Sequence, residues 1–179
     1  QVYIWQMNGL TIGSEGGVRA PDRTWHIQDT GDFGGDGKAD VLWRNTNGQV
    51  YIWEMNGIGI RAEGGVRAPD NTWHIQDTGD FNGDGKSDLL WRNDNGQVYI
   101  WEMNGLSILA EGAVRAPDNT WHVHDTGDFN GDGKDDVSWR NDNGQVYLWQ
   151  MNGLAIGSEG AVRAPDNSWH MVGHHYDLV

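Results

Sequence analysis

The sequence contains no cysteine, so disulfide bonds contribute nothing to its stability, which is compatible with secretion but does not require it. It is also poor in basic residues. Only 12 Lys and Arg accompany 26 Asp and Glu, which gives a formal net charge of -14. Nucleic acids and anionic membrane surfaces recruit proteins through clustered positive charge, so this balance argues against both as partners. We expect neutral or cationic partners instead.

Long apolar runs are missing as well. No stretch approaches the ~18 apolar residues that a membrane-spanning helix needs, so no membrane insertion is expected. The opening QVYIWQMNG has neither a basic region nor a small-residue cleavage site, which suggests a mature protein or an excised fragment. What the chain does have is 37% hydrophobic residues with 11 Trp, enough for the core of a globular domain.

The dominant feature of the sequence is an internal repeat with a period of 48 residues. QVYIW begins at Gln1, Gln49 and Gln97, QVYLW begins at Gln145, and the second and third units differ at only 9 of 48 positions. Each unit holds four segments that read as short strands, for example TWHIQDTGDF, DLLW, QVYIWEMNG and IRAEGGV, and none has a helical pattern. Four-stranded units at this period indicate β-propeller blades, so the expected fold class is all-β.

Turn signals separate these segments. Asn-Gly pairs predict type I′ hairpins, because Asn and Gly tolerate the positive φ angles of both central positions. Pro and Asp in RAPDNTW predict the turn that leads from one unit to the next. The pairs are Asn47-Gly48, Asn95-Gly96 and Asn143-Gly144 before the third segment, and Asn8-Gly9, Asn56-Gly57, Asn104-Gly105 and Asn152-Gly153 after it.

The two ends of the chain together supply parts of one blade. The chain begins at a third segment and ends after SWHMV, a first segment, which predicts ring closure. We expect a single propeller domain of four blades per chain. A ring-forming homodimer of eight blades and a piece of a longer array are the alternatives. The expected blades are residues 25–68, 73–116, 121–164, and 169–179 combined with 1–20.

Three Asp-rich loops precede the second strand of a unit: DFGGDGKAD, DFNGDGKSD and DFNGDGKDD. Oxygen atoms at loop positions 1, 3, 5 and 9, with the carbonyl of Lys at position 7, can surround a hard cation. Trp stands where an EF-hand needs Glu, so we expect a strand-to-strand calcium loop. In a plain turn the clustered carboxylates would only repel one another. Three Ca²⁺ ions per chain are expected, and they would offset about six negative charges. The expected ligands are Asp32, Asp36, Lys38 and Asp40; Asp80, Asn82, Asp84, Lys86 and Asp88; and Asp128, Asn130, Asp132, Lys134 and Asp136.

The motif GDFNGDGKSDLLW followed by GQVYIW resembles the FG-GAP/VCBS repeat, which forms the β-propeller of integrin α-subunits and of some fungal and bacterial lectins. The resemblance covers almost the whole chain and implies calcium within each Asp-rich loop. Two departures matter. Gly34 replaces the Asn of position 3, so we expect a weaker first site. GHHYDLV stands in place of a fourth loop, so we expect a metal-free fourth blade.

Near-identical units argue against an enzyme, since an active site normally needs a unique asymmetric set of groups. No catalytic residue is therefore expected. The repeated Trp-His pairs, Trp25-His26, Trp73-His74, Trp121-His122 and Trp169-His170, are expected to be structural. The strand tryptophans expected in the core are Trp43, Trp53, Trp91, Trp101, Trp139 and Trp149.

In an antiparallel meander, WRNDNG and RAPDNTW share the end of the blade opposite the calcium loops. Their aromatic and polar groups are of the kind that neutral sugars require, although they also suit plain turns. Two functions follow: a calcium-stabilised multivalent lectin, and an integrin-like protein-interaction or structural module. The partner is then a glycan or another protein, in an extracellular or cell-surface setting. The candidate ligand residues are Arg19, Asp22, Trp25, Arg67, Asp70, Trp73, Asn93, Arg115, Asp118, Trp121 and Asn141.

Overall fold

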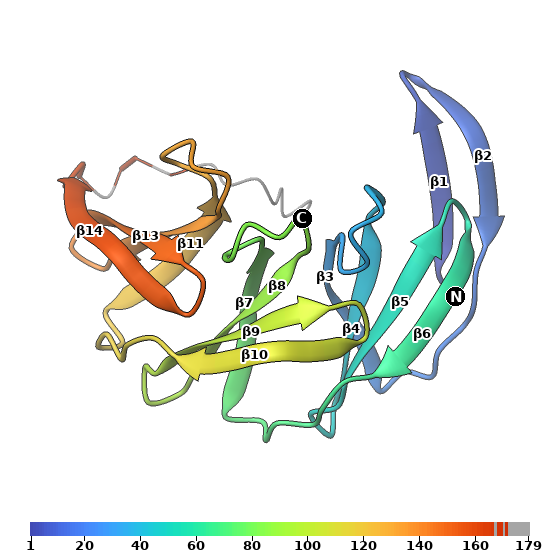
Figure 1. Cartoon of the computed structure of the whole chain (residues 1–179), viewed down its shortest axis with the longest axis horizontal. Coiled ribbons are helices and arrows are strands. Elements are labelled where there is room, and N and C mark those ends of the chain that lie inside the picture. The colour runs from blue at the N-terminus through green and yellow to red at the C-terminus, as the bar shows by residue number, and fades with distance from the viewer. Residues whose placement is uncertain (167, 170, 172–179) are drawn as a thin grey trace. The chain divides into compact units, whose positions relative to one another are not determined.

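A computed structural model describes residues 1–166, 168–169 and 171, and all regular secondary structure among them is β-strand (Figure 1). Fourteen strands form one two-stranded sheet and three four-stranded sheets. The expected all-β class is confirmed, and the four-stranded sheets give a β-propeller-like arrangement. A fourth blade closed by the C-terminal segment stays a prediction, because residues 170 and 172–179 lie outside the described residues.

The strands follow the repeat closely, and each four-stranded sheet is an antiparallel meander of four consecutive strands. No helix in the described part of the chain could cross a membrane. The strands are β1 (Tyr3–Asn8), β2 (Thr11–Gly17), β3 (Trp25–Gly31), β4 (Asp40–Asn45), β5 (Val50–Asn56), β6 (Gly59–Gly65), β7 (Trp73–Gly79), β8 (Asp88–Asn93), β9 (Val98–Asn104), β10 (Ser107–Ala113), β11 (Trp121–Gly127), β12 (Asp136–Asn141), β13 (Val146–Asn152) and β14 (Ala155–Arg163).

The chain divides into two compact units. The first contains Gln1–Asn71 and Asn104–Ile108, and the second contains Thr72–Met103 and the chain from Leu109 onward. In the first unit the core is built on the alternating apolar residues of β4 and β5. The rings of Trp43 and Trp53 lie 4.7 Å apart in this cluster.

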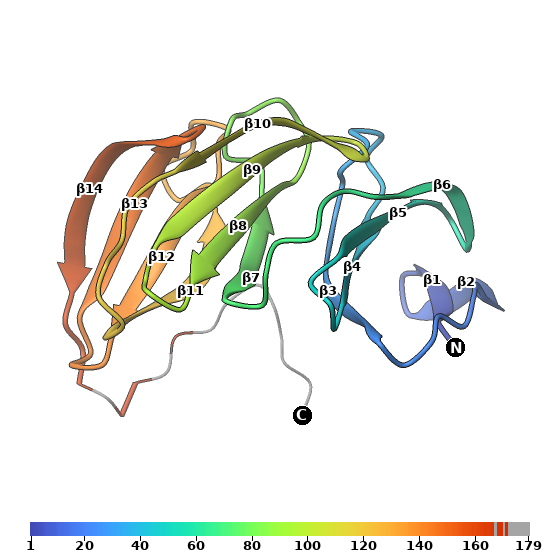
Figure 2. The ribbon, with the colours of Figure 1, turned by 90° about the horizontal axis from the view of Figure 1, so that it is seen from below.

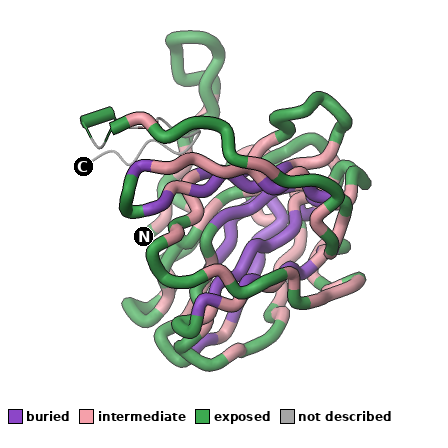
Figure 3. The backbone as a smooth tube through the Cα atoms, turned by 90° about the vertical axis from the view of Figure 1, so that its left-hand side faces the viewer, coloured by how far each residue is buried: buried purple, intermediate pink, exposed green. Residues whose placement is uncertain are grey.

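The core of the second unit joins two sheets. Phe81, Leu90 and Ile100 pack in one buried cluster with Trp139 and Trp149. Strands β7 and β11, the first strand of each sheet, lie in contact within this unit (Figure 2). Figure 3 shows the buried segments gathered in the interior of the backbone. Most buried residues belong to strands, and Phe33 and Phe81 of the Asp-rich loops are buried with them.

All six strand tryptophans expected in the core are buried, with at most 5% of each exposed. They sit at the same two positions of every sheet, one on the second strand and one on the third. Each pair makes a tilted ring contact at 4.5 to 4.7 Å. The prediction of core packing is confirmed for Trp43, Trp53, Trp91, Trp101, Trp139 and Trp149.

The type I′ prediction for the Asn-Gly turns is wrong. A type I′ turn needs positive φ at both central residues, and among the described residues only glycines have positive φ. In the turn before β5, the Gly48 N–H donates to the carbonyl of Asn45 at 2.9 Å, and φ of Gly48 is 93°. This is a three-residue loop with glycine at its bulge. The side chain of Asn47 accepts the Gln49 N–H at 3.0 Å, which explains why Asn is favoured there without a positive φ.

The second kind of turn is also different. Asn56 pairs with Gly59 across β5 and β6, so Gly57 is the first of only two loop residues, and its φ of 64° matches a type II′ turn. The Asn of the Asn-Gly pair is therefore the last strand residue and needs no positive φ. The same glycine position has φ of 60° to 62° in the other three hairpins.

Candidate functional site

Each Asp-rich loop connects the first and second strands of a four-stranded sheet and coils around its own first carboxylate. In the second loop, Asp80 accepts the N–H groups of Gly83, Asp84 and Gly85 at 2.7 to 3.1 Å. Gly85 has φ of 81°, a conformation that side chains other than glycine rarely adopt. The Asp and Gly residues therefore stabilise the conformation of the loop itself, whether or not a ligand is bound.

The Asp at position 9 begins the second strand and is buried in all three sheets, with at most 2% exposed. One oxygen of Asp88 accepts the Met103 N–H at 2.8 Å, and the other accepts the Phe81 N–H at 3.1 Å. Burial, with the nearby charges of Asp80 and Asp84, raises the pKa of Asp88 to about 8. This carboxyl group therefore ties the loop to the third strand, and its burial beside Asp80 and Asp84 disfavours its charged form unless a cation is bound.

The equivalent carboxylate of the third loop is held in the same way. Oδ1 of Asp136 accepts the Met151 N–H at 2.9 Å, and the backbone N–H of Phe129 also hydrogen-bonds this carboxylate. Burial raises the pKa of Asp136, and the charges of Asp132 and Asp128 raise it further. A bound cation would favour the charged form of these clustered carboxylates.

The predicted calcium ligands are only partly brought together. Within residues 1–166, 168–169 and 171, no three acidic or histidine side chains gather closely enough for a preformed metal cluster. Backbone N–H groups take up many of the oxygens instead. Calcium at these loops remains a prediction, which the second and third loops fit best because they keep side-chain oxygens at positions 1, 3, 5 and 9.

An additional acid lies beside the second loop, and the sequence pattern alone did not point to it. Glu102, on β9, hydrogen-bonds Asn82. Burial, together with the charge of Asp84, raises the pKa of Glu102. The second loop is therefore lined by one more carboxylate than its motif contains.

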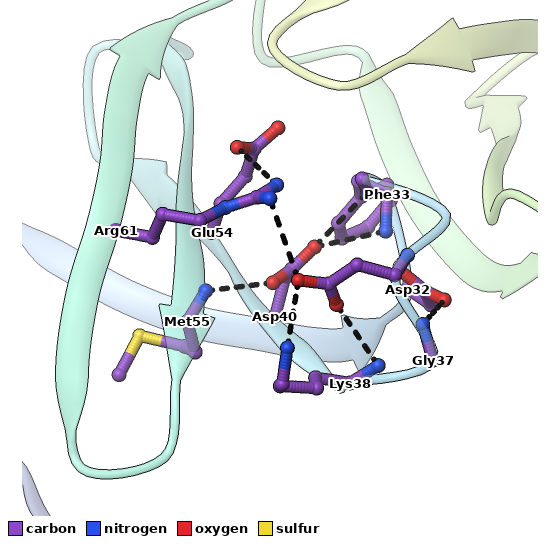
Figure 4. Close-up of polar contacts among 10 residues, drawn as sticks. Asp32, Phe33, Gly37, Lys38, Asp40, Glu54, Met55 and Arg61 are labelled. Atoms are coloured by element: carbon purple, nitrogen blue, oxygen red, sulfur yellow. Dashed lines mark hydrogen bonds and ion pairs between the residues drawn. The ribbon is translucent and has the colours of Figure 1, made fainter.

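The first loop has a different electrostatic environment (Figure 4). Arg61, on β6, places Nη1 3.4 Å from Asp36 and Nη2 3.0 Å from Glu54. The Lys38 ammonium lies 3.0 Å from the same Asp36 oxygen, and its hydrogen bond is the main cause of the lowered pKa of Asp36. Two cations already accompany the carboxylates of this loop.

Hydrogen bonds join two of the Asp-rich loops to MNG turns. Gly153, in the MNG turn of the third sheet, donates its N–H to the carbonyl of Phe81 in the second loop at 2.8 Å. In the first unit, the Gly105 N–H donates to Phe33 at 2.9 Å in the same way. These two MNG turns each support the Asp-rich loop that lies one repeat earlier.

Two aromatic pockets of matching composition lie near the RAPDNTW linkers. Corresponding residues of the two pockets are separated by twice the repeat period. The first, of about 290 Å³ in the first unit, is lined by Arg19, Pro21, Asp22, Trp25, Trp43, Tyr51 and Trp53. The second, of about 170 Å³ in the second unit, is lined by Arg115, Pro117, Trp121, Trp139, Tyr147 and Trp149.

The pocket walls are fixed by ring contacts and one cation. The Trp25 ring meets the edge of Tyr51 at 5.6 Å. The Arg19 guanidinium lies 5.6 Å from the centre of the Trp53 ring and pairs with Glu63 at 2.6 Å. Arg115 repeats the stacking contact in the second pocket. The aromatic surfaces are therefore held in place before any ligand arrives.

One polar atom in each pocket has no partner. The indole N–H groups of Trp43 and Trp139 are buried and make no hydrogen bond within the part of the chain that the structure describes. Buried Trp N–H groups usually find an acceptor. A ligand with an apolar face would complement the aromatic walls of each pocket.

The candidate ligand residues separate into two groups. Arg19, Asp22 and Trp25 line the first pocket, and Arg115 and Trp121 line the second. The others do not line these two pockets.

Several of the remaining candidates serve turns. Asn93 and Asn141 donate to the hydroxyls of Thr72 and Thr120 at 2.8 and 2.7 Å. Asp118 accepts the Thr120 N–H at 3.0 Å, as expected for a turn former. Asn141 also lines a separate pocket, of about 340 Å³, near the end of β12. Among the candidates in the linker between the first two blades, Trp73 packs against Tyr99 at 5.7 Å, while Arg67 and Asp70 have partners within the fold.

The histidines of the Trp-His pairs lie at the surface. His74 and His122 contact Asp94 and Asp142 at 2.8 Å, across β7–β8 and β11–β12 respectively, with more than half of each side chain exposed. These are cross-strand surface pairs of the structural kind expected. His170 lies outside the described residues.

The arginine of each WRN motif has a structural role that the sequence analysis missed. Arg92 is 8% exposed and donates to the carbonyl groups of Trp121 and Asp118 in the following linker. Arg44 and Arg140 contact the carbonyl groups of their own following linkers at 3.2 to 3.5 Å. The recurrence of Arg directly after a strand Trp was the sequence signal that could have indicated these contacts with the linker.

Sequence comparison agrees with this repeat geometry. A family profile described as FG-GAP-like repeat matches residues 32–91 and 80–139, which together span more than half of the 179 residues. Each match begins at the first Asp of an Asp-rich loop and ends at the buried Trp of the following repeat. No curated protein is significantly similar to the chain.

Proposed function

Because the chain belongs to the FG-GAP-like repeat family, we propose that it is a non-catalytic binding module that calcium stabilises and that binds carbohydrate. Repeats of this family suggest β-propeller-like interaction modules, and they occur in extracellular or surface proteins. We propose the same setting for this chain, since calcium-binding modules of modest affinity are suited to extracellular calcium.

Calcium would be held by the second and third loops through the side-chain oxygens of positions 1, 3, 5 and 9. A bound ion supplies positive charge that the clustered carboxylates lack. The mutual repulsion of Asp128, Asp132 and Asp136 supports this assignment in the third loop, and the nearby carboxylate of Glu102 supports it in the second. Asp88 and Asp136 connect their loops to the third strand, so an ion would tighten the whole blade.

The observation that carries carbohydrate binding is the recurrence of one aromatic pocket at twice the repeat period. Sugar rings pack their C–H faces on aromatic side chains and offer oxygens to fixed donors. Trp43 and Trp139 each hold such a donor without a partner. Single pockets of this size bind weakly, but several on one molecule gain avidity on a glycan-coated surface.

A glycan array at high ligand density tests this proposal with the calcium-loaded protein. The double variant Trp43→Phe/Trp139→Phe keeps an aromatic ring in each pocket and removes both N–H donors. We expect the wild type to bind and the variant to lose most of its avidity, with melting temperatures compared to verify folding. No binding by the wild type to any glycan would refute the carbohydrate proposal.

Binding to another protein is the second candidate. The hairpin of β1 and β2 exposes Tyr3, Trp5 and Met7 by 54% to 63% and Leu10 completely. Contiguous exposed apolar residues often mark protein interfaces. Inhibition by free monosaccharides separates the two functions, because sugars compete for the aromatic pockets and leave this hairpin untouched.

A further inference from the structure

The first Asp-rich loop combines two departures from the repeat. Position 3 is Gly34, where the other loops have Asn82 and Asn130. Residue 61 is Arg, where the other units have Leu109 and, one repeat further, a glycine. The two changes occur in the same unit and in no other, although they lie on different elements.

In space the two departures meet. A Cβ atom at Gly34 would lie 2.8 Å from Nη2 of Arg61, too close for both to keep their places. The guanidinium therefore fills the space beside the loop that a position-3 side chain would need. A side chain at residue 34 requires Arg61 to move away.

The guanidinium also takes over the electrostatic role of a bound cation. It lies 3.4 Å from Asp36, the position-5 carboxylate, and 3.0 Å from Glu54 (Figure 4). The second sheet has the counterpart of this acid, Glu102, but a leucine in place of the arginine. In the first sheet Lys38 and Arg61 both accompany these carboxylates, whereas in the second sheet Lys86, 3.6 Å from Asp84, has no arginine at residue 109 beside it.

The oxygens of the first loop are all engaged by the protein. Asp32 accepts N–H groups on both oxygens, at 3.1 and 2.6 Å. Asp40 likewise accepts N–H groups on both of its oxygens at 2.7 to 3.2 Å. Asp36 accepts the Lys38 N–H on one oxygen and contacts the Lys38 and Arg61 cations with the other.

We propose that Arg61 is a built-in cation of the first loop, and that this loop binds no calcium. The inference rests on the proposed calcium function of the other two loops. It replaces the expected three ions per chain with two, and it makes the first blade independent of the calcium concentration.

Native mass spectrometry of the full chain in excess calcium tests this directly. The double variant Gly34→Asn/Arg61→Leu gives the first loop the second loop's residues at these two positions. The reciprocal variant Asn82→Gly/Leu109→Arg gives the second loop the residues of the first. We expect two ions on the wild type, three on the first variant and one on the second. Gly34→Asn alone, which keeps the arginine, should stay at two.

The outcomes separate this inference from the proposed function. Three ions on the wild type would overturn the role of Arg61 and leave the calcium function standing. No ions on any form would overturn both. A double variant Gly34→Asn/Arg61→Leu that keeps the wild-type count would also overturn the inference, once circular dichroism has verified that it is folded.

A second measurement needs no calcium at all. In chelator, Arg61→Leu should melt below the wild type, because Asp36 and Glu54 lose their counter-charge. Leu109→Arg in chelator should melt at or above the wild type, because it adds a cation beside Glu102. Equal melting temperatures for Arg61→Leu and wild type would contradict a built-in cation.

Discussion

Replacing Arg92 tests how the second four-stranded sheet is joined to the linker that follows it. Its guanidinium donates to the carbonyl groups of Trp121 and Asp118 and lies 5.4 Å from the centre of the Trp139 ring. Arg92→Met keeps an apolar stem of similar length and removes the charge. A hydrogen bond to a charged group contributes roughly 1.5–3 kcal/mol and a cation–π contact about 0.5–2 kcal/mol.

These contributions do not add in full, because burying the guanidinium has its own cost. Burial already lowers the pKa of Arg92, which shows that the charged form is poorly solvated there. We expect Arg92→Met to destabilise the fold by about 2–4 kcal/mol. A loss of ~3 kcal/mol would lower the folding equilibrium constant by roughly two orders of magnitude.

Urea unfolding at fixed calcium, followed by Trp fluorescence, measures this loss. Arg23→Met, in an exposed linker position, is the matched control and should cost under ~0.5 kcal/mol. If Arg92→Met lost no more than the control, the guanidinium would not be what fastens the linker to the preceding blade.

Three further predictions concern Phe81, Gly48 and His124. Phe81→Ala should cost ~3–5 kcal/mol in urea unfolding, because the ring is fully buried. Phe129→Ala, at the same loop position but 44% exposed, should cost clearly less. Gly48→Ala should cost more than ~1 kcal/mol, since φ is 93° and a Cβ would collide with a linker carbonyl. Burial lowers the pKa of His124, so the unfolded chain binds more protons near pH 6 and stability should fall as pH drops from ~7 to ~5. His124→Gln, which copies Gln76, should remove this part of the acid sensitivity.

Each of these three predictions would be contradicted by a specific result. Equal losses for the two Phe variants would contradict the burial difference, and an unchanged midpoint for Gly48→Ala would contradict the turn geometry. An identical pH dependence of stability for wild type and His124→Gln would show that the buried imidazole does not cause the loss of stability in acid.

Much of the fold could be predicted from the repeat. Four short apolar segments in each 48-residue unit became the four strands of each sheet, because alternation with turn residues leaves the backbone few other ways to pair. The buried tryptophans followed from their apolar flanks. The turn types did not follow, since Asn47 stabilises its loop with a side-chain hydrogen bond and not through a positive φ.

The first loop shows why part of the site could not be predicted. Gly34 reads from the sequence as the simple loss of a ligand. Its meaning depends on Arg61, which lies on another strand and reaches the loop only in the folded chain. The aromatic pockets were anticipated in part, through Arg19, Asp22 and Trp25. Asn93 shares their polar character but serves a turn, and only the fold distinguishes these roles.

The central claim is that calcium bound in the Asp-rich loops stabilises the blades. Comparing the melting temperature in excess calcium with that in chelator tests this claim directly. At about 100 times the dissociation constant, each ion adds ~2.7 kcal/mol, so two ions add roughly 5 kcal/mol. For a chain of this size that corresponds to a rise of roughly 10–20 °C. We predict such a shift for the wild type by scanning calorimetry. The same melting temperature with and without calcium would contradict the account.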